Sequence, residues 1–276
     1  MRRLLSANLA RLGKNHLFWL SLSALFALSV ISMLNGCRQA AANAAEEVHY
    51  LEDYFFNLVP ILGVFFSAFI SLFLGTEYSD GTIRNKVVVG HKRSHIYLAN
   101  LLTCAAASML HVLAWLIGGL VGIPSLGLWH MSALQLCCYL MITLLISFAL
   151  SAIFTFLSMV SSGKAVTAVV SLLLFLALLV CGSMIYNRLC EPELQGGMMI
   201  TAEGMQMTEP APNPAYLGGG IRSVYETILN ILPTGQAILL ANLEVVKPVF
   251  QMIASVVSAL AVSVLGILIF QKKDLK

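Results

Sequence analysis

The stretch YFFNLVPILGVFFSAFISLFL, residues 54–74, contains no charged side chain. A helix needs about 20 mostly apolar residues to cross the hydrocarbon core of a bilayer, which is about 30 Å thick. A lone strand would leave backbone groups unpaired in lipid, so a helix is the expected conformation. Five further windows have the same character. The sequence therefore predicts six transmembrane helices, at residues 17–34, 54–74, 101–123, 134–160, 165–186 and 248–270.

The composition of the whole chain agrees with these windows. Of 276 residues, 59% are hydrophobic and 11% are charged, and the mean hydropathy is +0.87. Soluble domains carry about 25% charged residues. So few charges cannot cover a water-facing surface of this size, which excludes a soluble protein. We expect one all-α integral membrane domain over residues 1–276.

The distribution of Lys and Arg predicts the orientation. With the N-terminus inside the cell and six spans, twelve of the sixteen basic residues fall in cytoplasmic segments. Lys and Arg gather on that side of membrane proteins. The twelve are Arg2, Arg3, Arg11, Lys14, Arg84, Lys86, Lys92, Arg93, Lys164, Lys272, Lys273 and Lys276. The pattern predicts that both termini are cytoplasmic. It leaves Arg38, Arg188, Arg222 and Lys247 outside.

A cleaved signal peptide is the alternative interpretation of the first window. Leu34–Cys37 resembles a lipoprotein cleavage box. Against this, the segment before Leu17 is long, the apolar run can span a bilayer, and Asn35 fits the box poorly.

Two segments outside the spans show amphipathic patterns. Residues 1–14 place Leu5, Leu9 and Leu12 at helical spacing. This predicts a helix at the cytoplasmic interface, although a basic tail that only orients the first span is equally compatible. In the long outer loop, residues 187–247, the first half looks irregular and residues 221–232 predict a helix that Pro233 ends. Residues 237–243 are apolar but too short to span, so we expect a re-entrant or interfacial segment.

The cytoplasmic segment between the second and third spans, residues 76–96, combines an acidic residue, a Gly-Thr turn and a basic stretch. A short helix here would present charges to a soluble partner. The alternative is a solvated basic loop that merely follows the orientation rule.

Sequence motifs in this segment resemble those of a known family. Glu77-x-x-x-Gly81-Thr82, followed by basic residues and Arg93, resembles the permease subunits of ABC-2 type exporters. Asn213–Leu217 and Leu232–Gln236 look like the outer-loop signatures of that group. The resemblance implies six spans, a cytoplasmic coupling helix and an outer re-entrant segment.

The resemblance also implies partners and a location. It implies an ABC ATPase subunit, a second permease subunit that is identical or different, membrane lipids around the chain, and a multi-pass position in a bacterial plasma membrane. The implied ATPase-docking residues are Glu77, Gly81, Thr82, Arg84, Lys86 and Arg93.

The chain itself lacks a nucleotide site. A phosphate-binding loop needs Gly-x4-Gly-Lys-Ser/Thr, and the nearest match, Gly163-Lys164-Ala165, has no hydroxyl and no first glycine. We therefore expect no enzymatic activity and no cofactor in this chain, with ATP and Mg²⁺ bound by the partner ATPase. No metal site is expected, because His91 and His95 lack a third ligand. A disulfide between Cys37 and Cys190 stays open, and no pattern indicates nucleic-acid binding.

Polar and small residues mark faces of the predicted spans. His111 lies near the middle of the third span, and Asn100 and Ser108 share its helical face. They form part of a substrate path, or they are uncharged side chains, His111 among them, that hydrogen-bond to a neighbouring helix. Small residues every fourth position predict close helix packing. They are Gly63, Ser67, Ser71 and Gly75 on the second span, and Gly118 and Gly122 on the third.

Taken with the resemblance, these features favour an exporter permease subunit that moves a hydrophobic or amphipathic substrate, such as a drug, an antimicrobial peptide or a lipid. One alternative is an ion-coupled secondary carrier, which would need charges inside the spans that the windows lack. Another is a membrane sensor or assembly protein that transports nothing.

Overall fold

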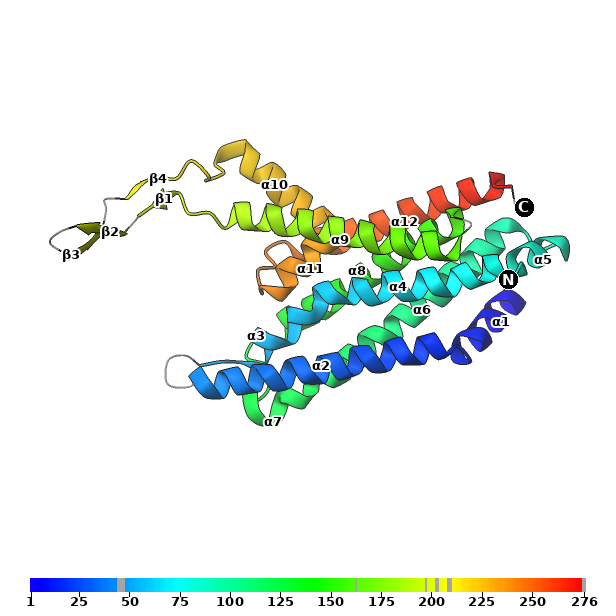
Figure 1. Cartoon of the computed structure of the whole chain (residues 1–276), viewed down its shortest axis with the longest axis horizontal. Helices are drawn as coiled ribbons and strands as arrows, with labels where there is room; N and C mark the ends of the chain where they lie inside the picture. The colour runs from blue at the N-terminus through cyan, green and yellow to red at the C-terminus, as the bar shows by residue number, and fades with distance from the viewer. Residues whose placement is uncertain (44–47, 162, 197, 202–203, 208–209, 275–276) are drawn as a thin grey trace.

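The computed structural model describes residues 1–43, 48–161, 163–196, 198–201, 204–207 and 210–274 (Figure 1). Six of its helices are long and apolar enough to cross a membrane. They are α2 (His16–Asn43), α4 (Val59–Ser79), α6 (Arg93–Gly119), α8 (Ala133–Val160), α9 (Lys164–Leu189) and α12 (Pro248–Lys272). Counted with the short helices that extend α4 and α6, each contains one predicted window, which confirms the all-helical class and the number of candidate spans.

Short helices extend two of the long ones. α3 (Leu51–Phe55) and the 3-10 turn η1 (Phe56–Leu58) lead into α4, and η2 (Leu120–Gly122) and α7 (Ile123–Leu126) continue α6. Both extensions lie at the same end of the bundle, which we call the distal end. The other end carries both chain termini together with α1 (Arg2–Gly13) and α5 (Thr82–Val88), and we call it the terminal end (Figure 1).

The bundle has a buried centre and an apolar periphery. α4, α6 and α8 are buried over at least half of their apolar windows, whereas α2, α9 and α12 are buried over less than a third. Leu20, Val166, Leu173, Met184 and Leu260 of the outer helices are all more than half exposed. An apolar surface this extensive is not stable in water. The periphery therefore requires lipid or another apolar partner.

The small residues singled out in the sequence lie at helix contacts. Phe175 of α9 packs so closely on Gly63 that a Cβ atom has no room there. A Cβ at Gly75 would lie 2.9 Å from the Cα of Lys164, also in α9. Ser67 and Ser71 are fully buried on α4 between these two glycines. This stripe lets α4 and α9 approach at backbone distance.

Gly118 of α6 and Gly122 of η2 face α2 in the same way. A Cβ at Gly118 would lie 2.7 Å from the Cβ of Ser29, and one at Gly122 would lie 2.5 Å from the Sδ of Met33. In addition, the Ser29 hydroxyl donates to the Trp115 carbonyl at 2.9 Å.

The first half of the long loop differs from the expectation. It was predicted to be irregular, but β1 (Leu194–Gln195) pairs with β4 (Ala211–Pro212), and β2 (Met198–Thr201) pairs with β3 (Gly204–Met207), both antiparallel. The resulting hairpin projects away from the bundle beyond α9 (Figure 1). The composition gave no strand signal here, because this hairpin covers no core and so needs no alternation of apolar and polar residues. Its backbone hydrogen bonds are made by pairing between the strands.

The second half of the loop folds back onto the bundle. α10 (Gly219–Ile231) covers the helix expected at residues 221–232, and Pro233 begins α11 (Pro233–Ala241). Proline suits the first turn of a helix because its missing N–H is not needed there. Every residue from Pro233 to Leu240 is buried, and α11 packs against α9, α8 and α4. The short apolar stretch is thus an interior helix of the half of the bundle that includes the distal end, which we call the distal half (Figure 1).

Candidate functional site

A buried carboxylate organises the terminal end. Glu77 lies in the last turn of α4 and is only 1% exposed. Its Oε1 accepts from Arg11 Nη1 of α1 at 2.8 Å and from Lys86 Nζ of α5 at 2.6 Å. Its Oε2 accepts from Asn100 Nδ2 of α6 at 2.9 Å. One side chain therefore connects four helices.

Two asparagines close this network. Asn8 Nδ2 of α1 donates to Asn100 Oδ1 at 2.6 Å, and Asn8 Oδ1 accepts from Lys86 Nζ at 3.0 Å. Both asparagines are at most 2% exposed. Each of these contacts pairs a donor with an acceptor, as a buried polar network requires, but Arg11 Nε and Nη2 are buried without a hydrogen-bond partner. We call Asn8, Arg11, Glu77, Lys86 and Asn100 the Glu77 cluster.

The Glu77 cluster holds two cations against one carboxylate. Burial lowers the pKa of Arg11, while the nearby Glu77 charge opposes that shift. An arginine remains charged under such conditions, and its guanidinium also lies 3.9 Å from the ring centroid of Phe73. The cluster is therefore cationic overall, although it lies beside the ends of membrane-spanning helices.

The Gly-Thr pair forms the turn that returns the chain to the Glu77 cluster. Gly81 has φ +66°, in the left-handed region that other residues rarely adopt. The next residue, Thr82, donates its hydroxyl to the Glu77 carbonyl at 2.9 Å. This tight reversal places Lys86, one turn into α5, over Glu77.

The side of α5 that faces away from Glu77 is exposed to solvent. Arg84 and Asn85 are exposed, and Val88 and Val89 are 78% and 77% exposed, whereas Ile83 on the inner side is buried. A shallow depression of about 310 Å³ lies beside them and is lined by Thr82, Asn85, Lys86, Val89 and His91. We call Arg84, Asn85, Val88 and Val89 the α5 tip.

A second set of contacts ties the same region to the end of the chain. Arg93 Nη1 donates to the carbonyls of Gln271 at 3.1 Å and Phe270 at 3.4 Å, and also to the Lys273 carbonyl. These acceptors belong to the end of α12, where helix carbonyls lack intrahelical partners. Arg93 therefore caps α12 and does not face outward.

Lys273 reaches from α12 to the end of α8. Its Nζ donates to the carbonyls of Met159 at 3.1 Å and Ser161 at 2.9 Å and to the Tyr78 hydroxyl at 3.2 Å. The Tyr78 hydroxyl donates in turn to the Met159 carbonyl at 2.5 Å. Burial lowers the pKa of Lys273 to about 8. Arg93 and Lys273 thus connect the ends of α8 and α12 to residues 76–96.

The six residues predicted for docking therefore divide into three groups. Glu77, Lys86 and Arg93 make internal contacts, and Gly81 and Thr82 shape the turn. Of the six, only Arg84 points outward with its charge unpaired in the described part of the chain. Sequence reasoning missed Asn8, but a usable signal existed. Asn8 repeats with Leu4 and Leu12 on the buried face of α1, where a polar residue needs a partner.

The predicted substrate-path residues lie in packed surroundings. Asn100 belongs to the Glu77 cluster, and Ser108 is 1% exposed. His111 Nε2 lies 2.9 Å from Ser21 Oγ of α2, and its Nδ1 lies 2.8 Å from the Ala107 carbonyl. The rings of Phe18, Phe66 and Phe69 surround the imidazole. These contacts favour a hydrogen-bonded seam between α2 and α6.

The six cysteines are free thiols, so Cys37 and Cys190 are not joined in this structure. Cys37 lies in α2, and Cys190 follows the last residue of α9. The disulfide that the sequence left open therefore plays no part in holding the loop to the bundle here.

Comparison with known proteins identifies the family. Residues 4–186 match the family model described as ABC-2 family transporter protein. The match contains α1 from Leu4 onward, residues 76–96, the whole Glu77 cluster, and five of the six long helices up to Tyr186 of α9. No curated protein matches the chain. An all-helical membrane bundle with this match over more than half of its length belongs to the ABC-2 family of transporter proteins.

Proposed function

We propose that the chain is the permease subunit of an ATP-binding-cassette exporter and that its α5 tip receives a separate ATPase subunit. The observation that carries the proposal is the exposed α5 tip standing directly on the buried Glu77 cluster. The family is one of ABC transporters, which implies an ATPase partner and a dimer of permeases in general.

The Glu77 cluster supplies a route for mechanical coupling. Pressure on α5 displaces Lys86, whose Nζ lies 2.6 Å from Glu77 Oε1. Because Glu77 also contacts Arg11 and Asn100, α1, α4 and α6 shift as one body. Separating them would leave a buried carboxylate and two cations unpaired, which is strongly unfavourable. ATP-driven closure of the partner would in this way reach three helices at once.

The terminal end faces the cytoplasm in this proposal. Eleven of the twelve basic residues assigned to the inside lie in α1 or directly after it, in α5, in the loop before α6, in the first turns of α6 and α9, or at or directly after the end of α12. The twelfth, Lys276, lies outside the described residues. These elements all belong to the terminal end (Figure 1). Basic loops remain on the cytoplasmic side during insertion, which supports an N-in, C-in topology.

The distal half would then face outward. α11 is buried among α4, α8 and α9 and is too short to span a bilayer. This supports its role as the re-entrant segment between the fifth and sixth spans. We further propose a bacterial plasma membrane location, an identical or different second permease, and a hydrophobic or amphipathic substrate. In this scheme the chain is not an enzyme and binds no cofactor, and ATP and Mg²⁺ belong to the ATPase.

The test is copurification of a Walker-motif ATPase with Arg84→Glu and Val88→Asp variants. Both changes place a negative charge on the α5 tip without touching the Glu77 cluster. We expect loss of ATPase association and of ATP-dependent export, with an unchanged melting temperature. Arg2→Glu is the matched control, because Arg2 is an exposed cation of α1 at the same end. Full association in both tip variants would refute docking at α5.

Lys86→Glu is not a clean test of docking. Lys86 is half-buried and bonded to Glu77, so the substitution would place two carboxylates together and disturb the fold.

A further inference from the structure

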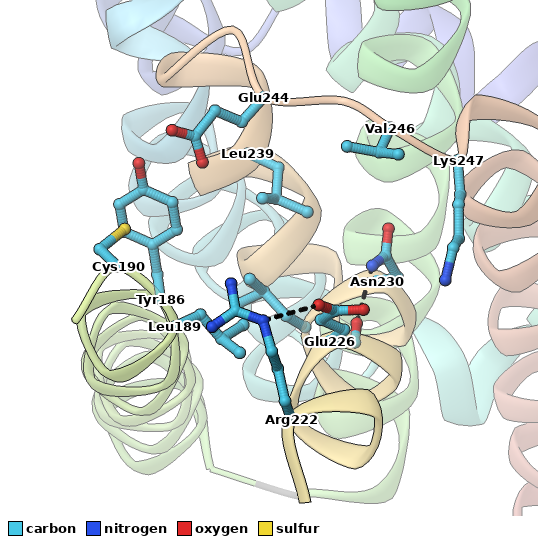
Figure 2. A pocket seen from close by; sticks show the side chains of 11 residues that line it. Tyr186, Leu189, Cys190, Arg222, Glu226, Asn230, Leu239, Glu244, Val246 and Lys247 are labelled. Carbon is cyan, nitrogen blue, oxygen red and sulfur yellow. Dashed lines mark hydrogen bonds and ion pairs between the residues drawn. The ribbon is translucent and has the colours of Figure 1, made fainter. Parts of the chain in front are cut away.

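The distal half contains a cavity of about 320 Å³ between α9, α10 and the connection from α11 to α12 (Figure 2). Three of its four charged lining residues have partners. Arg222 Nε lies 3.3 Å from Glu226 Oε1, and the Tyr186 hydroxyl hydrogen-bonds to Glu244. The fourth, Lys247, is exposed to solvent. A pattern that indicates a ligand lies instead in the hairpin that follows α9.

Methionine is concentrated in this hairpin. Four of the twelve methionines of the chain fall within residues 198–207. In most proteins methionine fills irregular gaps in apolar cores. Here β2 and β3 pair with each other and project beyond the bundle, where they cover no core (Figure 1). Core packing therefore does not explain why methionine recurs in these two strands.

The register of the two strands places three of these methionines on one face of the hairpin. Met198 is the partner of Met207, and Ile200 is the partner of Met205. Partners in an antiparallel ladder share a face, and so do residues two apart on one strand. Met198, Met205 and Met207 therefore belong to one face, which we call the Met face. Met199 belongs to the opposite face.

The backbone spacing on the Met face suits a single small ion. The Cα atoms of directly opposite residues lie about 4.5–5.5 Å apart, and those of residues two apart on a strand lie about 7 Å apart. Methionine has three rotatable bonds. Thioether sulfur atoms carried at these three positions can therefore converge on one point.

The base of the hairpin is fixed by hydrogen bonds. β1 pairs with β4, and Asn213 Nδ2 donates to Glu191 Oε2 and to the Pro192 carbonyl, both at 3.0 Å. The backbone N–H of Asn213 also donates to the Glu193 carbonyl at 3.0 Å. The two ends of the segment that carries the Met face are thus held together, which reduces the conformational entropy lost when a ligand binds.

The charge around the Met face favours a cation. Residues 189–221 contain four glutamates and no Lys, Arg or His. A one-sided charge distribution of this kind attracts ions of the opposite sign. β2 and β3 themselves contain no charged residue. The strands therefore offer neutral sulfur ligands within a negative surrounding.

We propose that the Met face binds one Cu(I) ion through the thioethers of Met198, Met205 and Met207. Soft thioether ligands select Cu(I), whereas Mg²⁺ and Ca²⁺ prefer oxygen, and the usual zinc ligands are thiolates, imidazoles and carboxylates. The expectation of no metal site concerned His91 and His95, and a thioether site is of another kind. That the Met face lies outside the cell rests on the proposed function, whereas Cu(I) binding does not.

The test is an anaerobic Cu(I) titration of the purified full chain in detergent, in competition with a chromogenic Cu(I) chelator. The free cysteines are alkylated beforehand, because thiolates also bind Cu(I). We expect one ion per chain. Met198→Leu, Met205→Leu and Met207→Leu should each weaken binding at least about tenfold, since losing even an outer-shell partner costs about 10–100-fold in metal affinity.

Met199→Leu is the matched control, because it removes a thioether from the neighbouring position on the opposite face. Its affinity for Cu(I) should equal that of wild type. The affinity of wild type should also stay constant between about pH 7 and about pH 5, because a thioether has no proton to lose, whereas an imidazole is protonated in this range.

Three results would overturn the proposal. They are no Cu(I) binding by wild type, equal weakening in Met199→Leu, and wild-type affinity in the triple variant that carries Leu at all three positions of the Met face. Loss of ATPase docking at α5 with Cu(I) binding intact would refute the proposed function alone. Docking without Cu(I) binding would refute this inference alone.

Discussion

The two ends of the bundle use ion pairs in opposite ways. At the terminal end, Glu77 is buried and contacts three other helices through bonds of 2.6–2.9 Å. At the distal half, the Arg222–Glu226 pair lies within one helix at 3.3 Å, with side chains 35% and 40% exposed. Because the first group is buried, breaking it is costly. Because the second pair is exposed, it contributes little to the free energy of unfolding. This difference agrees with the proposal that the terminal end transmits a displacement, and it leaves the Arg222–Glu226 pair accessible to solvent.

The largest effect should follow from breaking the buried group. Glu77→Gln keeps the shape of the side chain but leaves Arg11 and Lys86 without their anion. Removing one partner of a buried ion pair costs about 3–5 kcal/mol. We expect a marked fall in the thermal unfolding midpoint, measured by tryptophan fluorescence in detergent.

A second substitution separates charge from packing in that experiment. Adding Lys86→Met to Glu77→Gln removes one excess cation and should recover part of the lost stability. Glu226→Gln is the control, because it removes a carboxylate from an exposed pair. An equal loss of stability in Glu77→Gln and Glu226→Gln would show that the two ends do not differ.

The sequence predicted the six apolar helices and a short charged helix, α5, between two of them, because both depend on local properties. Six apolar windows are visible without knowing how they pack, and a charged segment between two of them must lie outside the hydrocarbon. The contacts of individual charges are not local. Arg84 and Lys86 are two residues apart on α5, which turns about 200° between them. One faces solvent and the other Glu77.

The parts that escaped prediction are assembled from distant segments. The Glu77 cluster needs Asn8 and Arg11 from α1, and the cavity needs Tyr186, Glu226 and Lys247 from three elements. No spacing within one segment reveals such a group. The hairpin at residues 194–212 was missed for another reason, since two short ladders give too little alternation to distinguish them from an irregular loop.

A smaller effect should appear at Lys273, which connects the terminal end to α8. Its pKa in the folded chain is about 8, below the usual value near 10.4 of an unfolded lysine. Between these two pKa values the unfolded chain binds more protons than the folded chain, so the free energy of unfolding rises with pH in this window. Below pH 8 Lys273 is protonated in both states and adds no pH dependence. We expect wild type to gain stability over Lys273→Met as the pH increases from 8 to 10.

Paired melting curves of the two proteins across that range measure the effect, and Lys272→Met controls for loss of a neighbouring exposed cation. A difference between wild type and Lys273→Met that stays constant from pH 7 to 10 would contradict the lowered pKa of Lys273.

The smallest effect should come from the exposed pair of α10. Arg222→Gln removes an i,i+4 contact worth about 0.3–0.5 kcal/mol, and salt should remove most of that difference because solvent-exposed charges are screened. In contrast, the loss caused by Glu77→Gln should hardly change with salt, because ions do not reach a buried carboxylate. Melting curves of both variants at about 0.01 M and 1 M salt therefore compare the two ends directly. A salt-insensitive loss in Arg222→Gln would mean that the pair is shielded from solvent ions, and the two ends would then not differ in this respect.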